Sequence, residues 1–171
     1  MLYIFDIDGT ITEDYKSTLL PDAEKWFARN QPTAVALATN QGGAGLRRWM
    51  ETAGFGNPEN YPTEMEVRER VAAIAGAIKR LTGNEVATYI SFLYFSQKGN
   101  WQPIPDGEQD NQEWSMAWRK PNPGMLLQAA ADAGLRPMKC VFVGDTETDM
   151  QAAEAAGMNY TQRDVFFFLR R

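Results

Sequence analysis

Apolar and polar positions along the chain follow two alternating patterns. Short apolar runs at 2–5, 33–38, 86–95 and 139–143 have the length and composition of buried strands, and residues 158–161 have the pattern of a last short strand. Between these runs, apolar residues recur every three or four positions, which is the spacing of helices that bury one face. Strands that alternate with helices are typical of a parallel sheet. The pattern therefore predicts an α/β fold with a mostly parallel central sheet.

Capping residues and glycines mark where the predicted helices begin and end. Expected helix starts are Pro21, Thr63 with Glu66 as a capping box, Asn122 before Pro123, and Thr148 with Gln151 as a second capping box. The last three helices should end at Gly83, near Gly134 and at Gly157. For residues 164–169 a helix, a strand and an interface element all stay open, and Phe166–Phe168 suits either internal packing or an oligomer contact.

Two segments lack these regular patterns. Residues 42–62 carry many Gly, Pro and Asn residues and are expected to form a long loop that holds at most a short helix at 46–52. Residues 96–119 are polar and turn-rich, and they contain Trp101, Trp114 and Trp118. No linker and no internal repeat divides the 171 residues, so we expect a single domain, 1–171.

Composition narrows the chemistry that this fold can carry. The chain has no histidine, which excludes Ser-His and Cys-His catalysis as well as histidine-ligated zinc. Its single cysteine, Cys140, lies in an apolar run and is expected to be a buried, inert thiol. The net charge of −5 argues against a nucleic-acid surface, because such surfaces depend on Lys and Arg. Any catalysis should therefore use carboxylates, lysine, hydroxyl groups and a hard metal ion.

The length of the apolar runs indicates the expected location of the protein. No apolar run approaches the length that spans a membrane, and an aspartate at position 6 argues against a signal peptide. We therefore expect a cytoplasmic protein without a membrane partner.

Polar side chains gather where the predicted strands end. They are Asp6 and Asp8 after the first run, Thr39 and Asn40 after the second, and Asp145 and Asp149 after the run at 139–143, with Lys120 just before a helix. Because ligands bind outside the carboxyl ends of strands in open parallel sheets, we expect these side chains to share one site. Two carboxylates about 4 Å apart repel by about 4 kcal/mol at an effective dielectric constant of about 20, so the group should bind protons or a cation.

The ligand types in this group indicate which cation and which substrate would suit it. Sites built only from oxygen ligands favour Mg²⁺, which often binds one or two carboxylates together with substrate phosphate. Lysine, a threonine hydroxyl and backbone N–H groups beside Mg²⁺ suit a phosphoryl group. Without histidine, cysteine or an activated serine, the best candidate nucleophile is an aspartate carboxylate.

These residues also form four short motifs. "DIDGT", "ATNQGG", "RKPNPGM" and "GDTETDMQAA" resemble, in order and spacing, the four motifs of the haloacid dehalogenase-like (HAD) hydrolase superfamily. The resemblance extends from Phe5 to Gly157 and is nearest to the branch with histidinol-phosphatases, heptose bisphosphate phosphatases and polynucleotide 3′-phosphatases. It implies a Rossmann-like three-layer sandwich. A large cap domain is not expected, because only residues 10–20 separate Gly9 from the next predicted helix.

The resemblance assigns the acids their roles. Asp6 would be the nucleophile that forms an aspartyl-phosphate, and also a Mg²⁺ ligand. Asp8 would protonate the leaving oxygen and then deprotonate the attacking water, while its backbone carbonyl binds the metal. For this role the Asp8 carboxyl should lie outside the metal shell, where crowding by other acids raises its pKa. Asp145 and Asp149 would complete the metal site, Asp149 directly or through a water molecule.

The resemblance also assigns the phosphate-binding groups. Thr39 would bind the transferring phosphoryl group through its hydroxyl, helped by the backbone N–H of Asn40. Lys120 would neutralise phosphate charge and hold Asp6.

The segments 41–62 and 96–119 are expected to be insertions on the substrate side. Their candidate substrate contacts are Arg47, Arg48 and Trp101, although a solvated face suits the two arginines equally well and packing suits the tryptophan better. Related branches carry a cysteine-rich zinc loop near the second segment, and residues 96–119 contain no cysteine. We therefore expect no such zinc site.

The expected function is a Mg²⁺-dependent phosphomonoesterase that acts on a small phosphorylated metabolite, such as a sugar, amino-alcohol or nucleotide phosphate. A polynucleotide 3′-phosphatase is the alternative, which the acidic charge balance disfavours. Outside the enzymes, the alternative is a catalytically retired HAD module that binds partners. The presence of Asp6, Asp8 and Lys120 argues against that alternative. The sequence leaves the oligomeric state open.

Overall fold

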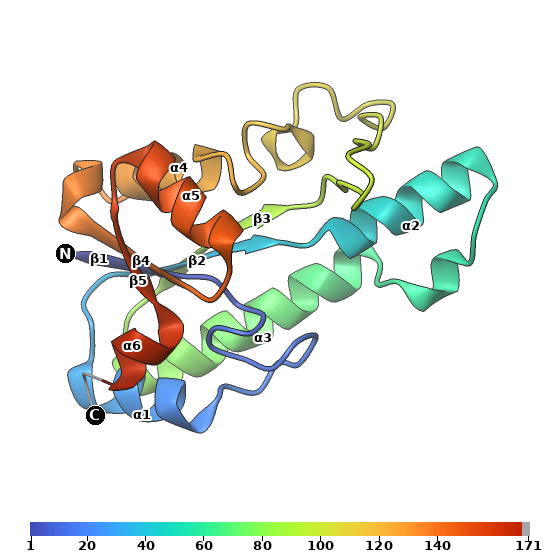
Figure 1. Cartoon of the computed structure of the whole chain (residues 1–171). Coiled ribbons are helices and arrows are strands. Elements are labelled where there is room, and N and C mark those ends of the chain that lie inside the picture. The colour runs from blue at the N-terminus through green and yellow to red at the C-terminus, as the bar shows by residue number, and fades with distance from the viewer. Residues whose placement is uncertain (169–171) are drawn as a thin grey trace.

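The computed structural model describes residues 1–168 of the chain. Five strands form one sheet in the order β3-β2-β1-β4-β5, and every neighbouring pair runs parallel (Figure 1). The strands are β1 (Leu2–Phe5), β2 (Val35–Asn40), β3 (Val86–Ser91), β4 (Cys140–Gly144) and β5 (Asn159–Gln162). The predicted α/β fold with a parallel sheet is confirmed. The third strand is shorter than predicted, because the chain leaves the sheet after Ser91.

Helices cover both faces of the sheet. They are α1 (Pro21–Asn30), α2 (Gly42–Ala53), α3 (Glu64–Thr82), α4 (Gly124–Asp132), α5 (Glu147–Ala156) and α6 (Arg163–Phe168), with short 3₁₀ helices at Pro58–Asn60, Gln112–Trp114 and Pro137–Lys139. In Figure 1, α4 and α5 lie above the sheet and α1, α3 and α6 lie below it. This arrangement is the expected three-layer sandwich.

The two hydrophobic cores follow from the alternation of side chains along each strand. Phe5 and Leu37 belong to the core beneath α1, α3 and α6. Ile4 and Ala36, one position earlier, belong to the core beneath α4 and α5. Successive residues of a strand point to opposite faces, so a strand buried on both faces is apolar throughout. Cys140 is a buried free thiol in the second core, as expected.

The C-terminal aromatic segment is a helix, as far as residue 168. Phe166 and Phe167 are 1% and 3% exposed and pack against Phe5 and Trp26, whereas Phe168 is 65% exposed. Of the alternatives for residues 164–169, the helix is therefore correct, and Leu169 lies outside the described residues. Phe166 and Phe167 pack inside the chain instead of forming an oligomer contact.

The segment at 42–62 differs most from its prediction. Most of it is the twelve-residue helix α2, which projects beyond the sheet in Figure 1. Its glycines suggested a loop, but Gly45 serves close packing, because a Cβ there would collide with the Phe92 carbonyl and the Gln102 side chain. A glycine that allows two backbones to approach looks the same in sequence as a glycine that permits a turn.

The helix starts were predicted with mixed success. The capping box of α3 is confirmed, since the Glu66 N–H donates to Thr63 Oγ1 at 3.1 Å and the Thr63 N–H donates to Glu66 Oε2 at 2.7 Å. The predicted box of Thr148 with Gln151 is wrong. Helix α5 begins two residues earlier, and its box pairs Thr146 with Asp149. Helix α4 likewise starts with Pro123 as its N-cap, one residue after the predicted Asn122.

The described helices include none that is both long enough and apolar enough to cross a membrane.

Candidate active site

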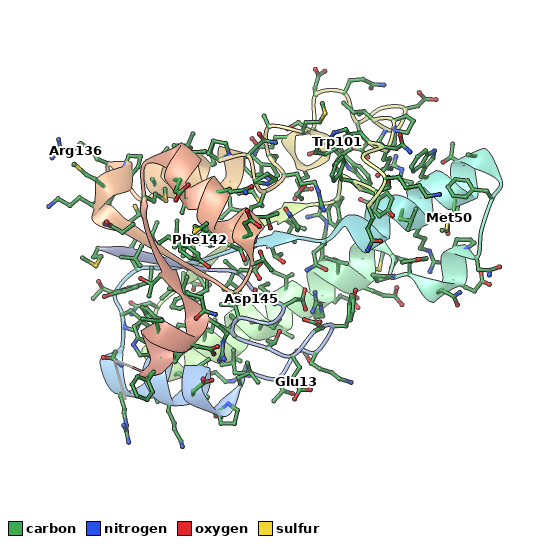
Figure 2. All side chains as sticks on the ribbon, viewed as in Figure 1. Glu13, Met50, Trp101, Arg136, Phe142 and Asp145 are labelled. Atoms are coloured by element: carbon green, nitrogen blue, oxygen red, sulfur yellow. The ribbon has the colours of Figure 1, made fainter. Side chains whose placement is uncertain are left out.

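A cavity of about 400 Å³ lies where β1, β2 and β4 end, and we call it the acid cavity. Its lining includes the whole predicted cluster: Asp6, Asp8, Thr39, Asn40, Lys120, Asp145 and Asp149. Figure 2 shows Asp145 near the middle of the molecule, with Trp101 well away from it toward α2. The parallel register of β1 with both β2 and β4 brings these three strand ends to one edge.

Lys120 is the electrostatic centre of the cavity. Its side chain is 3% exposed, and its ammonium nitrogen lies 2.7 Å from Asp6 Oδ1, 2.6 Å from Asp149 Oδ1 and 3.0 Å from the Ala38 carbonyl oxygen. Burial acts to lower the pKa of Lys120, but the two carboxylates outweigh it and raise the pKa above its ordinary value. The lysine therefore stays charged, and it pairs with two acids where the motif had suggested only Asp6.

Asp6 is held in an environment that resists its negative charge. Burial raises the pKa of Asp6 to about 7, and the nearby Asp149 and Asp145 carboxylates act in the same direction, while Lys120 opposes them. A second cation beside Asp6 would lower this pKa and favour the carboxylate form, because opposite charge stabilises the ionised acid.

Three acids offer the beginning of a cation site. One carboxylate oxygen from each of Asp6, Asp145 and Asp149 lies within 4.8 Å of the others. Burial and the neighbouring Asp149 raise the pKa of Asp145, which is the expected response of an acid without enough counter-charge. An all-oxygen donor set of this kind fits a hard divalent cation such as Mg²⁺.

Thr10 and Gly9 shape this acidic group. The Thr10 hydroxyl lies 3.0 Å from Asp145 Oδ1 and 3.4 Å from Asp6 Oδ2, so it bridges the two acids. Gly9 has a φ of 73°, and a Cβ there would collide with the Asp145 carboxylate. The expected sharp turn at Gly9 is therefore present, and Asp6 and Asp8 both face the cavity. The role of Thr10 was missed, although it lies inside the "DIDGT" motif.

Asp149 uses both of its oxygens within the protein. Oδ1 accepts from Lys120, and Oδ2 accepts from the Thr146 N–H at 3.1 Å and from the Thr146 hydroxyl at 2.7 Å. Burial acts to raise the pKa of Asp149, but Lys120 and Thr146 outweigh it and lower the pKa. Asp149 is therefore a fixed anion that orients the lysine.

Asp8 differs from the expectation about its pKa. Both of its oxygens are hydrogen-bonded, by Arg70 at 2.6 and 2.9 Å, by Gln41 at 2.8 Å and by the Tyr15 N–H at 2.8 Å. Burial acts to raise the pKa of Asp8, but the hydrogen bonds from Arg70 and Gln41 outweigh it and lower the pKa. The predicted rise through crowding by other acids is wrong, because Arg70 supplies a positive partner. The carboxyl lies outside the group of three acids, as its predicted role requires.

Arg70 was missed for a clear reason. It lies on α3, 62 positions after Asp8, in a segment without a motif. Its neighbours Val67, Val71 and Ile74 form the buried face of that helix, and nothing local marks the arginine between them. Gln41 lies in the "ATNQGG" motif, which predicts no role for it, and it joins Asp8, Arg70 and Thr39 in one hydrogen-bond network.

Asn40 and Thr39 both line the acid cavity, and Asn40 also makes a contact that was not predicted. The Asn40 side chain donates to the Lys120 carbonyl at 2.9 Å and accepts from the Lys120 N–H at 3.1 Å, so it clamps the lysine segment to β2. Thr39 is 1% exposed, and its hydroxyl accepts from Gln41 at 2.9 Å.

The three candidate substrate contacts lie away from the acid cavity, whose described lining does not include Arg47, Arg48 or Trp101. Arg47 pairs with Glu51 and with the Tyr61 carbonyl. Arg48 binds Glu64 and Glu108 and stacks over the Trp114 ring.

Trp101 packs against Phe95 with 4.6 Å between ring centroids. Trp114 and Trp118 are 0% and 6% exposed. These contacts favour a packing role for all five side chains.

Arg119 lines the acid cavity and had no predicted role. Its Nη1 atom is buried and has no hydrogen-bond partner among the described residues. Burial lowers the pKa of Arg119. The sequence signal was its place directly before Lys120 in "RKPNPGM".

A second cavity of about 680 Å³ adjoins the first, and we call it the side cavity. The two cavities share the lining residues Tyr15, Gln41, Gly43 and Pro62. Tyr15 has the strained φ of 61° and a side chain that is 77% exposed, and its N–H is held by Asp8. Strained backbone of this kind persists only where surrounding contacts hold it.

Comparison with known proteins supports the resemblance in sequence. A family model described as HAD-hydrolase-like matches residues 117–161, which contain Lys120, Asp145 and Asp149. A D-glycero-D-manno-heptose-1,7-bisphosphate 7-phosphatase of Thermosynechococcus vestitus is 48% identical over 89 residues, 52% of this chain and 44% of that protein. A phosphoglycolate phosphatase of Xylella fastidiosa is 54% identical over 44 residues, 26% of this chain and 19% of that protein. Each match therefore spans less than half of the relative.

Comparison with solved structures supports the fold. A D,D-heptose 1,7-bisphosphate phosphatase from B. bronchiseptica, complexed with magnesium and phosphate, aligns with a TM-score of 0.63 at 23% identity, over 94% of this chain and 79% of that chain. A putative HAD-like phosphatase from Mesorhizobium loti aligns with a TM-score of 0.52 at 24% identity, over 92% of this chain and 68% of that chain. The predicted Rossmann-like HAD fold is therefore confirmed.

Proposed function

We propose that this chain, which resembles the HAD-like hydrolases in its motifs and in its fold, is a Mg²⁺-dependent phosphomonoesterase acting on a small phosphorylated metabolite. The observation that carries the proposal is the buried Lys120 between Asp6 and Asp149, at the wall of a cavity that also holds Asp8 and Asp145. In this arrangement the candidate nucleophile, Asp6, lies beside the positive charge of Lys120 and beside the acids that would bind Mg²⁺.

In the first step, an Asp6 oxygen attacks the phosphorus atom, so that an oxygen–phosphorus bond forms as the ester bond breaks. Lys120 binds Asp6 through Oδ1, which keeps the carboxylate oriented and leaves its other oxygen toward Thr10. Thr39 is oriented by Gln41, so its own O–H can donate to the phosphoryl oxygens. Donors aimed at developing charge in a water-poor site are among the strongest catalytic contributions.

Asp8 carries the proton in both steps. It gives a proton to the leaving oxygen in the first step, and takes one from the water that breaks the Asp6–phosphorus bond in the second. The contacts from Arg70 and Gln41 stabilise the anionic form, which is the form needed to accept the proton from water. To act as the acid, Asp8 must first bind a proton, and the oxygen that binds it gives up a hydrogen bond from Arg70 or Gln41.

Asp6 and Asp145, with the Asp8 backbone carbonyl, are the proposed direct ligands of Mg²⁺, and Asp149 is proposed to act through water and Lys120. Both Asp149 oxygens already accept hydrogen bonds from Lys120 and Thr146, which supports the indirect role. When bound, the metal would neutralise phosphate charge and lower the pKa of Asp6. The similar structure from B. bronchiseptica was solved with magnesium and phosphate, which supports this choice of ion.

The test compares hydrolysis of a generic aryl phosphate by the wild-type chain and by Asp6→Asn, with Mg²⁺ and with a chelator. We expect activity that requires Mg²⁺ and that falls by at least about 10³-fold in Asp6→Asn, because a nucleophile has no substitute. Glu13→Gln is the matched control, since Glu13 is an exposed acid on the same segment and does not line the acid cavity. Undiminished activity in Asp6→Asn would contradict the proposal.

A substrate panel then identifies the class of ester. Sugar phosphates, amino-alcohol phosphates and nucleotides are tested beside oligonucleotides with a 3′-phosphate. We expect small esters to be preferred, and the heptose bisphosphate phosphatase from T. vestitus is one relative whose name indicates such a substrate. A strong preference for the oligonucleotides would replace the small-metabolite assignment by that of a polynucleotide 3′-phosphatase.

A further inference from the structure

The side cavity adjoins the acid cavity close to the proposed proton carrier, Asp8. Arg70 and Gln41 line the side cavity and hold both oxygens of Asp8, and Asp8 itself lines the acid cavity. Asp8 therefore lies in the acid cavity next to the boundary with the side cavity, where Gln41 lines both spaces. In the proposed reaction it protonates the leaving oxygen, so the remainder of the leaving alcohol would extend past it into the side cavity.

Aromatic and aliphatic side chains make up much of the side cavity wall. Tyr15, Tyr61 and Tyr94 line it from three separate segments, together with Leu46, Pro62 and Val67. Tyrosine presents a large flat surface and loses little conformational freedom on binding, so it suits contact with a planar ring. The volume of about 680 Å³ lies in the range of small-molecule pockets.

The charges of the side cavity are already engaged. Among its described lining residues the charged groups are Glu66 and Arg70. Glu66 accepts from the Thr63 N–H and hydroxyl in the capping box of α3. Arg70 donates to Asp8, to Gln41 and to the Lys16 carbonyl. A second phosphate placed here would meet one cation among the described lining residues, Arg70, which already binds Asp8 and Gln41, and it would lie near the negative charge of Glu66.

We propose that the side cavity is the leaving-group subsite and that it takes an uncharged planar ring, so that the substrates are monophosphate esters of alcohols that carry an aromatic ring. This proposal rests on the proposed function. It names a substrate class different from the bisphosphate in the name of the T. vestitus relative. Arg119, whose buried Nη1 atom has no hydrogen-bond partner among the described residues, lines the acid cavity and is absent from the described lining of the side cavity.

The binding test avoids catalysis altogether. Benzylphosphonate and methylphosphonate carry the same charged group and no ester bond, and they differ by one ring. In the presence of Mg²⁺, calorimetry should give a Kd for benzylphosphonate that is about tenfold lower, which corresponds to about 1.4 kcal/mol. Equal affinities, or no binding of either compound, would overturn the proposal.

Variants locate the effect. Tyr61→Leu and Tyr94→Leu should each reduce the ratio of the two affinities by about threefold or more, because leucine keeps apolar bulk and removes the flat ring. Phe168→Leu is the matched control, since Phe168 is an exposed aromatic residue on α6 outside the lining of both cavities. If the ratio of the two phosphonate affinities is unchanged in both tyrosine variants, the ring of benzylphosphonate binds elsewhere and the proposed subsite is wrong.

The kinetic test separates this proposal from the proposed function. Benzyl phosphate and ethyl phosphate have leaving alcohols of similar acidity, so the chemical step should be alike. We expect kcat/KM to be about tenfold higher for benzyl phosphate, because its KM is lower while kcat is unchanged. The tyrosine variants should raise KM for benzyl phosphate alone. Equal values, or a preference for fructose 1,6-bisphosphate, would overturn the subsite and leave the phosphatase standing. Absence of Mg²⁺-dependent hydrolysis of every ester would overturn the proposed function.

Discussion

The acid cavity and the side cavity adjoin each other but are built differently. Carboxyl ends of strands position the acids, and the buried Lys120 ties two of them together. Side chains from α2, α3 and three irregular segments form the side cavity, where Tyr15 is 77% exposed. A strand end cannot move without disturbing the sheet, whereas an exposed tyrosine can be replaced at little cost. Changes in the acid cavity should therefore affect stability and activity together, and changes in the side cavity should affect substrate choice.

The largest expected effect comes from Lys120→Met. Removing the ammonium group leaves Asp6 and Asp149 buried without a counter-charge, so the free energy of unfolding should fall by about 3–5 kcal/mol near neutral pH. Denaturant unfolding measures it, and Lys98→Met, an exposed lysine in the 96–119 segment, should change it by less than about 0.5 kcal/mol. A loss as small as that of the control would show that the acid cavity is not held by this lysine.

The pH dependence of the same variant has a definite sign. Burial raises the pKa of Asp6 to about 7, so the folded protein binds this proton more tightly than the unfolded chain does. Stability contributed by this group therefore increases as the pH falls through about 7. Without Lys120 the pKa should rise further, and the deficit of Lys120→Met should shrink between about pH 8 and about pH 5. A deficit that grows over this range would contradict the assignment.

An intermediate effect is expected from Arg70→Met, at the junction of the two cavities. The Asp8 and Arg70 side chains are 24% and 14% exposed. Because a hydrogen bond to a charged group contributes about 1.5–3 kcal/mol, the free energy of unfolding should fall by about 2 kcal/mol. The lowered pKa of Asp8 means that this stability is present above the unfolded pKa of about 3.8 and is lost as the pH falls below it. The difference from wild type should therefore vanish in acid.

The matched control for Arg70→Met is Arg80→Met, an exposed arginine on the same helix. Unfolding curves at several pH values compare the two variants. If the deficit of Arg70→Met persisted unchanged well below about pH 4, the arginine would stabilise the fold by packing instead of by its contact with Asp8.

The smallest effect is expected from Arg48→Met. The arginine is 31% exposed and pairs with Glu64 and Glu108, so its loss should reduce stability by about 0.5–1 kcal/mol. Because Arg48 lines neither cavity in the described structure, KM for any accepted ester should stay unchanged. Steady-state kinetics measures this, and a rise in KM would restore Arg48 as a substrate contact and weaken the contrast between the cavities.

Local patterns predicted the sheet and the acid cavity well. The short apolar runs of the strands and the polar residues at their ends depend only on neighbours in sequence, as at Asp6 after Phe5, Thr39 after Ala38 and Asp145 after Gly144. The same holds for the capping box at Thr63. Helix α2 was harder, because Gly45 gains its meaning from atoms that approach across the fold. The start of α5 was misplaced although its capping box is local, because that box uses Asp149 where the usual signature has Glu or Gln.

What the sequence alone determined is the alternation of strands and helices around a parallel sheet and the identity of the acids, lysine and hydroxyl that gather at one edge. Tertiary structure decided the partners that no motif indicated: Arg70 reaches Asp8 across 62 positions, and Lys120 also binds Asp149 across 29. It also decided that Phe166 is core while Phe168 is exposed. The physical reason is that periodicity arises from the geometry of one segment, whereas a charge pair depends on the packing of several.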